Sequence, residues 1–368
     1  MQMYSRFNTR HARTLLPKPK NIATIYFRRH KATSSRRFGF AFDIDGVLLK
    51  GDRVLPEAKK VLRGLSGESS GRRRIPFILL TNGGGVTEEE KASELSEKLG
   101  IRISPSELVL SHSPMCQLAS DFRNKNVLVV GGAGRACQTV AKKYGFDRVI
   151  VPDDILANDP SIWPFKKLPY DEIEQARKID FTREPIEAVM MFHDSRDWGR
   201  DLQIVTDVLV SEGGVVGTRR EDLSKQEIPL FFSNPDIIWS NNFPLPRLAQ
   251  GSFRLALKTI YKDLTGQELK YTLFGKPERT TYQYAEKLLN EHSKFIYGQT
   301  IESGRVYAVG DNPAADIAGA NAYGWTSILV RTGVFQGPEN KSEHQADFIA
   351  EHVEEGVRWA LSREGMSL

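Results

Sequence analysis

Two aspartates stand two residues apart directly after an apolar run near the start of the chain. The run from Phe38 to Phe42 is followed by Asp43, Asp45 and Gly46. If the chain stays extended, side chains at positions i and i+2 point the same way, and glycine then permits a sharp turn. One carboxylate could act as a nucleophile, while the other donates a proton to a leaving oxygen and later accepts one from water.

Two close carboxylates repel each other and would also repel a phosphate, so this chemistry needs a cation. Magnesium suits it, because Mg²⁺ prefers oxygen ligands and tolerates retained waters. Two other readings of the pair are an Asx turn and a calcium loop. A calcium loop of the EF-hand type is disfavoured, because Gly46 comes one residue after Asp45 and the apolar residues 47–49 follow.

A second polar group follows the apolar run Phe77 to Leu80. It consists of Thr81, Asn82 and Gly83, with two further glycines behind them. A hydroxyl, an amide and freely turning glycines can surround a phosphate with side-chain and backbone donors. The alternative is an ordinary turn between a strand and a helix.

Two later segments supply a cation and two more acids. Lys276 precedes Pro277, which fits the first turn of a helix, and a helix start attracts anions. Asp311 follows the apolar run 306–309 and could bind a metal ion directly. Asp316 could orient Lys276 or a metal-bound water, or it could cap the alanine-rich helix that follows.

These residues need a scaffold that brings strand ends together. Short apolar runs at 38–42, 77–80, 306–309 and 328–330 alternate with helical patterns, which predicts parallel strands joined by crossover helices. A capping box at Thr87 and Glu90 and a stop at Gly100 predict a helix over 88–99. In open parallel sheets ligands bind at the carboxyl ends of strands, so the polar groups should share one site.

The region 124–270 has its own strand–helix pattern. Strands are expected at 127–130, 149–151, 188–192 and 215–216, and helices near 135–144, 199–212 and 248–262, with a loop-rich excursion at 152–185. We therefore expect an α/β fold with a doubly wound parallel core and an inserted α/β cap. The expected divisions are a leader at 1–36, core at 37–123, cap at 124–270 and core again at 271–368.

The positive charge of the chain is concentrated in its first 42 residues. The whole chain has a formal net charge of +5, but this segment holds seven Arg and three Lys and no acidic residue. The remainder carries 41 basic and 46 acidic residues, so we expect no nucleic-acid partner. An Arg-rich, acid-free N-terminus is typical of a mitochondrial transit peptide, and we expect the matrix as the location. The alternative is a disordered basic tail of a cytosolic protein.

No stretch of the sequence approaches about 20 uninterrupted apolar residues, so no transmembrane helix is expected. Two cysteines, Cys116 and Cys137, show no metal-binding spacing. They fit a reducing compartment, with one disulfide between them left open.

The four segments, in this order, resemble the four motifs of the haloacid dehalogenase superfamily: Asp-x-Asp-Gly, Thr-Asn, Gly-Lys-Pro and Gly-Asp-x-x-x-x-Asp. Residues 45–51 and 316–320 look like subfamily IIA, which carries a large cap between the second and third motifs. Segments 193–198, 233–236, 244–251 and 331–334 are similar to the cat eye syndrome critical region protein 5 family, in a fungal mitochondrial form. That family is also called haloacid dehalogenase-like hydrolase domain-containing protein 5. The resemblance covers the chain from Phe38 onward.

The resemblance implies a role for each matching residue. Asp43 would be the nucleophile that forms an aspartyl-phosphate, and Asp45 the general acid and base that also lends a backbone carbonyl to Mg²⁺. Thr81, Asn82 and Gly83 would bind the phosphoryl group. Lys276 would balance its charge, and Asp311 and Asp316 would complete the metal site.

The function implied is hydrolysis of a small phosphate monoester, with glycerophospholipid metabolism as one source of the substrate. A low-activity scaffold protein of mitochondria and a phosphotransferase are the alternatives.

The expected cap contains three weaker signals. Gly131, Gly132 and Gly134 after a strand form part of a dinucleotide fingerprint, although Cys137 replaces its last small residue. His193, Asp194 and Arg196 could contact the leaving group, form a polar loop, or take part in a homodimer through the cap. Asn234 and Asp236 are candidates for cap closure within a turn.

Overall fold

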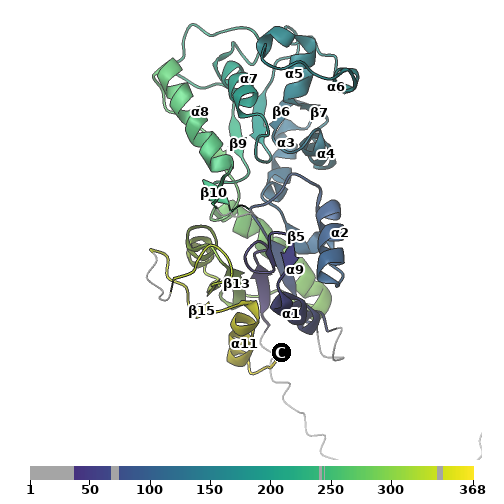
Figure 1. The fold of residues 1–368 in the computed structure, drawn as a ribbon, viewed down its shortest axis with the longest axis vertical. Helices are drawn as coiled ribbons and strands as arrows, with labels where there is room; N and C mark the ends of the chain where they lie inside the picture. The colour runs from purple at the N-terminus through teal and green to yellow at the C-terminus, as the bar shows by residue number, and fades with distance from the viewer. Residues whose placement is uncertain (1–36, 68–73, 240–242, 244, 338–342) are drawn as a thin grey trace, which may run out of the picture. The chain divides into compact units, whose positions relative to one another are not determined.

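The computed structural model describes residues 37–67, 74–239, 243, 245–337 and 343–368 (Figure 1). The expected leader, 1–36, lies outside these residues. The described chain has an α/β fold built on two parallel sheets with helices on both faces of each sheet. Within it, no helix is long and apolar enough to cross a bilayer.

The first sheet has six parallel strands in the order β15-β14-β13-β1-β4-β5. Their bounds are β1 (Gly39–Phe42), β4 (Phe77–Leu80), β5 (Leu108–Val109), β13 (Val306–Gly310), β14 (Thr326–Val330) and β15 (Phe348–Ala350). The chain adds strands outward from β1 in both directions, so the order reverses between β1 and β13. In open α/β sheets the ligand crevice lies at such a reversal, outside the carboxyl ends of the strands.

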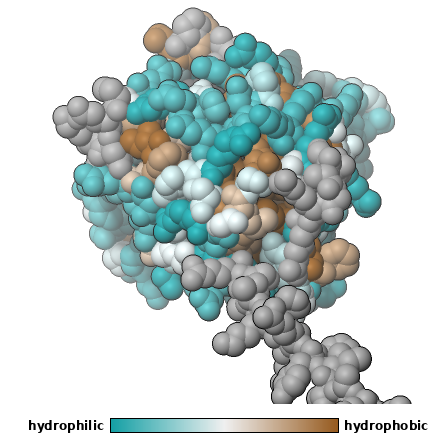
Figure 2. All heavy atoms as spheres, turned by 90° about the horizontal axis from the view of Figure 1, so that it is seen from below, coloured by the Kyte–Doolittle hydropathy of each residue, from teal (hydrophilic) through white to brown (hydrophobic). Residues whose placement is uncertain are grey.

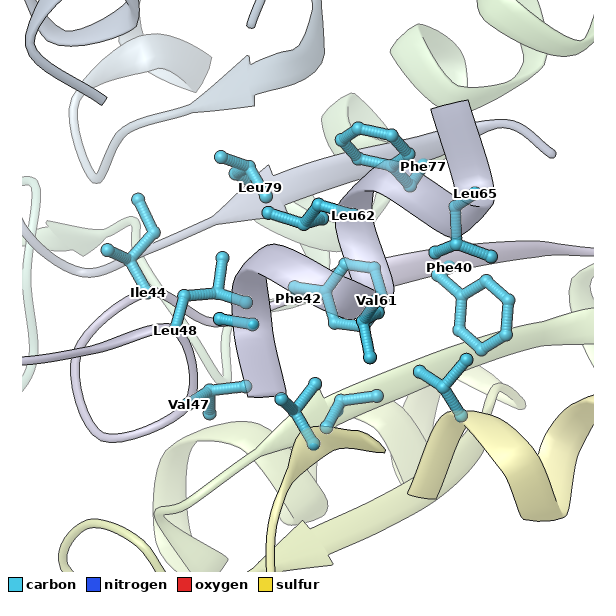
Figure 3. Packing of buried hydrophobic residues seen from close by; sticks show 14 of the residues in the cluster. Phe40, Phe42, Ile44, Val47, Leu48, Val61, Leu62, Leu65, Phe77 and Leu79 are labelled. Atoms are coloured by element: carbon cyan, nitrogen blue, oxygen red, sulfur yellow. The ribbon is translucent and has the colours of Figure 1, made fainter. Parts of the chain in front are cut away.

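Alternating side chains of β1 point to opposite faces of this sheet. Phe40 and Phe42 stack with ring centroids 5.4 Å apart and pack under α1 (Pro56–Ser66), as Figure 3 shows. Ala41 faces the opposite side, towards α9 (Arg279–Tyr297). Helices α2 (Glu88–Leu99) and α11 (Val353–Arg363) share the α1 side, and α10 (Ala318–Tyr323) shares the α9 side. Because both faces of this sheet are buried, the sequences of its strands are continuous apolar runs.

The second sheet has five parallel strands in the order β12-β9-β8-β6-β7. Their bounds are β6 (Asn126–Val130), β7 (Arg148–Ile150), β8 (Ala188–Met191), β9 (Leu230–Phe232) and β12 (Thr272–Leu273). The chain enters this sheet after β5 and returns to the first sheet through α9. Because β12 belongs here, the second sheet extends past the boundary that we expected at residue 270.

Helices of the second sheet divide between its faces. One face packs against α5 (Pro152–Asn158), α7 (Trp198–Val210) and α8 (Gln250–Thr265), and the other against α4 (Ala136–Lys143). The remaining elements are short: β2 (Leu49–Lys50), β3 (Arg53–Val54), β10 (Ile238–Trp239), β11 (Arg247–Leu248), α3 (Ala119–Phe122), α6 (Tyr170–Gln175), the 3₁₀-helices η1 (Pro105–Glu107), η2 (Ser113–Leu118), η3 (Pro160–Ile162) and η4 (Ser303–Arg305), and the π-helix η5 (Pro313–Ile317).

The structure confirms the strands and helices that strong local sequence signals predicted, and it corrects several predictions that rested on weaker signals. The predicted helix 88–99 is α2, and its capping box at Thr87 and Glu90 forms. Residues 215–216, predicted as a strand, lie in a turn, and the excursion 152–185 contains α5 and α6. Pro277 precedes α9, which begins at Arg279.

The face seen from below in Figure 2 is largely hydrophilic, with scattered apolar residues. Such scattered apolar side chains are normal on a protein surface.

A four-residue loop, Ser233–Asp236, follows β9 and supports the start of α8. The backbone N–H of Gly251 donates to the carbonyl of Asp236 at 2.7 Å. A side chain at Gly251 would overlap the carbonyl oxygens of Pro235 and Asp236. Glycine at this position therefore fixes how closely α8 approaches the loop.

Replacing Gly251 by alanine should displace this loop. We expect the free energy of unfolding to fall by about 1–3 kcal/mol, the usual cost of overpacking, although alanine is the better helix former. Gly304→Ala is the matched control, because its added Cβ would meet no atom within 4 Å. Urea unfolding of both variants measures the effect, and equal stabilities would contradict the steric argument.

Candidate active site

The ends of three adjacent strands carry the first predicted site residues. Asp43 follows β1, Thr81 follows β4 and Asp311 follows β13, and β1 lies between the other two strands. The backbone N–H of Asp43 donates to the carbonyl of Val309 at 2.9 Å, which extends the pairing of β1 and β13 by one residue. Sheet register alone therefore brings these residues together at the carboxyl edge of the sheet, where the strand order reverses.

Lys276 is the centre of the charge network. Its Nζ donates to Oδ1 of Asp43 at 2.6 Å, to Oδ1 of Asp316 at 2.6 Å and to the carbonyl of Leu80 at 2.9 Å. Its residue is only 3% exposed. Burial lowers the pKa of Lys276, but the carboxylates of Asp316 and Asp43 outweigh that effect and raise the pKa well above its ordinary value. The surroundings of Lys276 therefore favour its charged form.

Asp316 organises the turn after β13. Its Oδ2 accepts hydrogen bonds from the backbone N–H groups of Asp311 at 3.1 Å and Asn312 at 3.0 Å. The N-cap of the following π-helix is Asn312, whose Oδ1 accepts from Ala314 at 3.0 Å. The alternative in which Asp316 caps a helix is therefore wrong, and its position fits the orienting alternative.

Three buried carboxylates gather around one point. Asp43, Asp311 and Asp316 each offer an oxygen within 4.8 Å of the others. Gly46 makes this approach possible, because a Cβ there would lie 2.7 Å from Cγ of Asp311. Oδ2 of Asp311 accepts from the backbone N–H of Val334 at 2.6 Å, which holds it in place.

The crowding of these acids changes their proton affinity. Burial, and then repulsion from Asp316, raises the pKa of Asp311 to about 7. Burial raises the pKa of Asp43 well above its usual range against the pull of Lys276. Three carboxylates face one ammonium group, so the ionised cluster has two uncompensated negative charges. An all-oxygen, acid-rich cluster fits a hard divalent cation such as Mg²⁺.

Asp45 stands apart from this cluster. Its side chain is exposed, unlike that of Asp43. The surrounding protein nevertheless removes enough water to raise the pKa of Asp45, while Lys91 and Lys276 act in the opposite direction. An exposed carboxyl with a raised pKa is suited to exchanging protons with a bound ligand.

Asn82 joins the charge network to the second sheet. Its Oδ1 accepts from the backbone N–H of Lys276 at 2.7 Å, and its Nδ2 donates to the carbonyl of Lys276 at 3.0 Å. Nδ2 also donates to Oδ2 of Asp236 at 3.1 Å. Asn234 Nδ2 in turn donates to the carbonyl of Asn82 at 3.1 Å. Both amide protons of Asn82 are thus engaged within the protein.

Asp236 has an altered pKa because of this position. Burial raises the pKa of Asp236 to about 6, although the hydrogen bond from Asn82 lowers it. The sequence singled out Asn234 and Asp236 only as a turn with some potential for cap closure. Their contacts with Asn82 bridge residues that lie 152 and 154 positions apart, which local sequence patterns do not reveal.

The other predicted site residues lie near this centre. Thr81 Oγ1 accepts from the backbone N–H of Gly83 at 2.9 Å, which closes the loop after β4. His193 lies against Gly85 of the same loop, where an added Cβ would sit 3.2 Å from its Nε2. Burial lowers the pKa of His193 to about 4. The carbonyl of Asp194 accepts from Gly132 at 3.0 Å, so Asp194 supports the glycine loop after β6.

A hydrogen-bonded group that sequence reasoning did not identify connects α2 to α4. Tyr144 donates to Oε1 of Glu88 at 2.5 Å, and Ser113 donates to the same oxygen at 2.6 Å. Nδ1 of buried His112 lies 2.8 Å from the Tyr144 oxygen. Because Tyr144 uses its proton on Glu88, the ring nitrogen of His112 must donate. A polar Ser-His-Ser triplet directly after the apolar run 108–110 was the available signal.

Comparison with known proteins agrees with this geometry. Residues 40–147 match the model of a haloacid dehalogenase-like hydrolase family, and residues 273–356 match a second HAD-hydrolase-like model. A mitochondrial hydrolase of Saccharomyces cerevisiae is 36% identical over 356 residues, which cover 91% of this chain and 99% of the relative.

A second relative is longer than this chain. It is the cardiolipin synthase (CMP-forming) and mitochondrial hydrolase fusion protein of Schizosaccharomyces pombe, 44% identical over 326 residues. The match covers 88% of this chain but only 53% of the relative. The chain therefore spans about half the length of that relative.

Solved structures share the fold at low identity. The p-nitrophenyl phosphatase of Archaeoglobus fulgidus is similar with a TM-score of 0.57 and 18% identity, over 88% of this chain and 98% of that chain. NagD of Escherichia coli has a TM-score of 0.55 and 19% identity, over 87% and 98% of the two chains.

Removing the ammonium group of Lys276 should destabilise the cation-free protein. Lys276→Met leaves Asp43 and Asp316 buried without their shared partner, so we expect a loss of about 3–5 kcal/mol of unfolding free energy. Adding Asp43→Asn to this variant removes one unpaired charge and should restore part of the loss. Urea unfolding without divalent cations measures both.

The matched control is Lys98→Met, which removes a half-buried lysine that pairs with Glu94 and Asp52. That change should cost less than about 1 kcal/mol. Equal losses in the two lysine variants would contradict a special role for the buried ammonium group.

Proposed function

Because the chain belongs to the haloacid dehalogenase-like hydrolase family, we propose that it is a magnesium-dependent phosphatase acting through an aspartyl-phosphate on Asp43. The carboxylate of Asp43 carries this proposal. Its Oδ1 is held 2.6 Å from Nζ of Lys276, and its Oδ2 has no hydrogen-bond partner among the described residues. One oxygen is thereby oriented and the other is available to attack phosphorus.

Asp43, Asp311 and the backbone carbonyl of Asp45 would hold the Mg²⁺ ion, with Asp316 supporting from the turn after β13. The ion would supply positive charge that keeps the crowded carboxylates ionised and neutralises phosphate oxygens. Lys276 adds a fixed cation beside the attacking oxygen. Together they allow one anion to approach another.

Asp45 would act as the general acid in the first step and as the general base in the second. In the first step its protonated carboxyl gives a proton to the leaving oxygen, and the raised pKa of Asp45 favours that form. In the second step the carboxylate takes a proton from water, which then attacks the phosphoryl group on Asp43. The exposure of Asp45 is consistent with contact to both a leaving group and water.

In the loop 81–83, the Thr81 hydroxyl and the backbone N–H of Asn82 would bind the phosphoryl oxygens, and the N–H of Gly83 would orient that hydroxyl, to which it donates at 2.9 Å. The side chain of Asn82 is already committed to Lys276 and Asp236. We therefore assign Asn82 a positioning role, in which only its backbone faces the ligand. Asn82 would hold Lys276 in register with Asp43. His193 lies beside this loop and would border the leaving group.

The proposed substrate is a small phosphate monoester of glycerophospholipid metabolism, and the proposed location is the mitochondrial matrix. Both named relatives are described as mitochondrial hydrolases, and one is fused to a cardiolipin synthase. The acid-free basic segment 1–42 supports the same location. A panel of phosphorylated metabolites, assayed with Mg²⁺, tests the substrate class.

The variant Asp43→Asn tests the nucleophile directly. We expect hydrolysis of p-nitrophenyl phosphate to fall by at least about 10²–10⁴-fold, because an amide oxygen cannot replace the carboxylate nucleophile. The fold should persist, because Lys276 keeps Asp316 as a partner. Circular dichroism serves as the folding control.

Asp207→Asn on α7 is a matched control outside the proposed chemistry, because within the described chain its carboxylate accepts only from Gln203 at 2.8 Å, and it should retain most activity. Substantial turnover by Asp43→Asn would refute the assignment. A wild-type protein that hydrolyses no phosphate ester and gains no stability from Mg²⁺ would instead support a scaffold role. Transfer of phosphate to an added alcohol in place of water would support a phosphotransferase.

Stabilisation by Mg²⁺ should increase with pH. In the cation-free protein Asp311 keeps its proton up to a pKa of about 7, whereas an unfolded aspartate loses it near about 3.9. The folded state therefore binds more protons in this window, and raising the pH removes stability from the cation-free protein. Mg²⁺ must displace the same proton at low pH, so the cation should raise Tm more at about pH 8 than at about pH 5.5.

Scanning fluorimetry with and without MgCl₂ at both pH values measures this difference. Asp311→Asn should lose most of the Mg²⁺-dependent shift at both. A Tm shift that is the same at the two pH values in the wild-type protein would contradict the coupling.

A further inference from the structure

A short segment after Asp236 exposes a concentration of large apolar side chains. The described chain has fifteen exposed large apolar residues, and eight of them lie between residues 237 and 260. Six belong to the β10–β11 hairpin and its ends: Ile237, Ile238, Trp239, Phe243, Leu245 and Leu248. We call these six residues the apolar hairpin. Apolar surface of this density on a soluble protein usually marks an interaction site.

The apolar hairpin is exposed on both of its faces. Ile238 pairs with Leu248 and Trp239 pairs with Arg247, so the two pairs point to opposite faces of the ribbon. Ile238 is 51% exposed and Leu248 62%, while Trp239 on the other face is 43% exposed. A two-stranded ribbon without a covered face is marginally stable in water. A binding partner that surrounds the ribbon would therefore stabilise it more than a partner that covers only one face.

The charged side chains of this segment are all basic. From residue 237 to residue 262 the sequence contains Arg247, Arg254, Lys258 and Lys262 and no acidic residue. Glu268 pairs with Lys258 and Lys262, whereas Arg247 and Arg254 form no ion pair among the described residues. The guanidinium of Arg247 lies 4.3 Å from the ring centroid of Phe243, so one cation sits within the apolar hairpin itself. Apolar and aromatic side chains combined with basic residues are typical of segments that enter an anionic lipid interface.

We propose that the apolar hairpin inserts into the interfacial layer of an anionic bilayer and docks the protein on the membrane surface. A bilayer interface surrounds the ribbon from both faces and accommodates Trp239 at headgroup depth. The strands β10 and β11 pair with no further strand among the described residues, and the backbone groups at their outer edges keep the ribbon from entering the hydrocarbon core. Insertion is therefore shallow.

A second copy of the chain is the less suitable occupant. A pairing of flat surfaces would cover one face of the ribbon and leave the other exposed. It would also bring Arg247 and Arg254 of two copies close together, and neither arginine has an acidic partner among the described residues. An anionic surface satisfies both the apolar faces and the charge.

The position of the apolar hairpin connects docking to the site. Ile237 directly follows Asp236, whose side chain accepts from Asn82. The carbonyl of Ile237 accepts from the backbone of Ala249 at 2.9 Å and from Ser252 at 2.6 Å, which ties the hairpin to α8. Docking would thus hold the loop Ser233–Asp236 and its contact with Asn82 close to the membrane surface. The inference does not depend on the phosphatase proposal, because it concerns binding alone.

A fluorescent label can distinguish insertion of the hairpin from attraction of the basic N-terminal segment to lipid. We would place an environment-sensitive NBD group on Leu245→Cys in the full chain, with Cys116→Ser to remove the more accessible native thiol. The matched control carries the label on Phe295→Cys, an 83% exposed apolar position at the end of α9. Vesicles of phosphatidylcholine, with and without phosphatidylglycerol, are the probe.

We expect the label at 245 to brighten several-fold and shift to the blue with anionic vesicles, and to be quenched by lipids spin-labelled near the headgroup. The label at 295 should not respond. Adding Trp239→Ser and Leu248→Ser should weaken the response at 245. Substrate turnover is not measured, so failure here is distinct from failure of the proposed chemistry.

Three results would overturn the proposal. The label at 245 could remain water-like while the protein sediments with vesicles, which would assign binding to other segments. Both labels could respond equally, which would indicate nonspecific adsorption. The response at 245 could appear without vesicles and grow with protein concentration, which would identify a second copy as the occupant.

Discussion

One buried ammonium group, Nζ of Lys276, sets the conditions for the rest of the site. It lies 2.6 Å from carboxylate oxygens of both Asp43 and Asp316. Asp43 follows β1, near the start of the described chain, whereas Asp316 lies in the turn after β13, near its end. Neither acid could remain buried and ionised without a partner at this distance. The order of strands at the reversal between β1 and β13, the turn after β13 and the placement of Gly275 all serve to bring these three groups together.

The position of this ammonium group depends on the backbone of Lys276. Asn82, in the loop after β4, holds that backbone in place. Its amide pairs with both the N–H and the carbonyl of Lys276, much as a strand would. Gly275 lets the chain approach, because a Cβ there would lie 2.6 Å from the carbonyl oxygen of Ser233. Loop Ser233–Asp236 of the second sheet therefore packs directly on the residues that hold Lys276. A shift of that loop cannot leave the charge network unchanged, which couples the second sheet to the chemistry.

The sequence predicted the features that depend on local order and missed those that depend on distant contacts. Asp43, Thr81 and Asp311 were identifiable because each directly follows an apolar run, and parallel pairing brings such positions together. Helix α2 was predictable from its capping box. The strand at 215–216 was wrong because Gly214 and Gly217, both with positive φ, place these two valines in a turn. The roles of Asn82 and Asp236 depend on contacts across more than 150 residues, which no local pattern contains.

Accumulated negative charge at the strand reversal is costly to the fold and useful to the function. Three carboxylates with one ammonium group leave two negative charges uncompensated, and burial favours protonating Asp311 over keeping that charge. A fold selected for stability alone would replace one of these acids with a neutral residue, since neither the sheet register nor the hydrophobic core requires them all. The acids are better explained by the ligands they would receive, because a divalent cation would compensate their charge and attract a phosphate group towards Asp43. The same crowding that lowers the stability of the fold would therefore favour binding of a cation and an anion together.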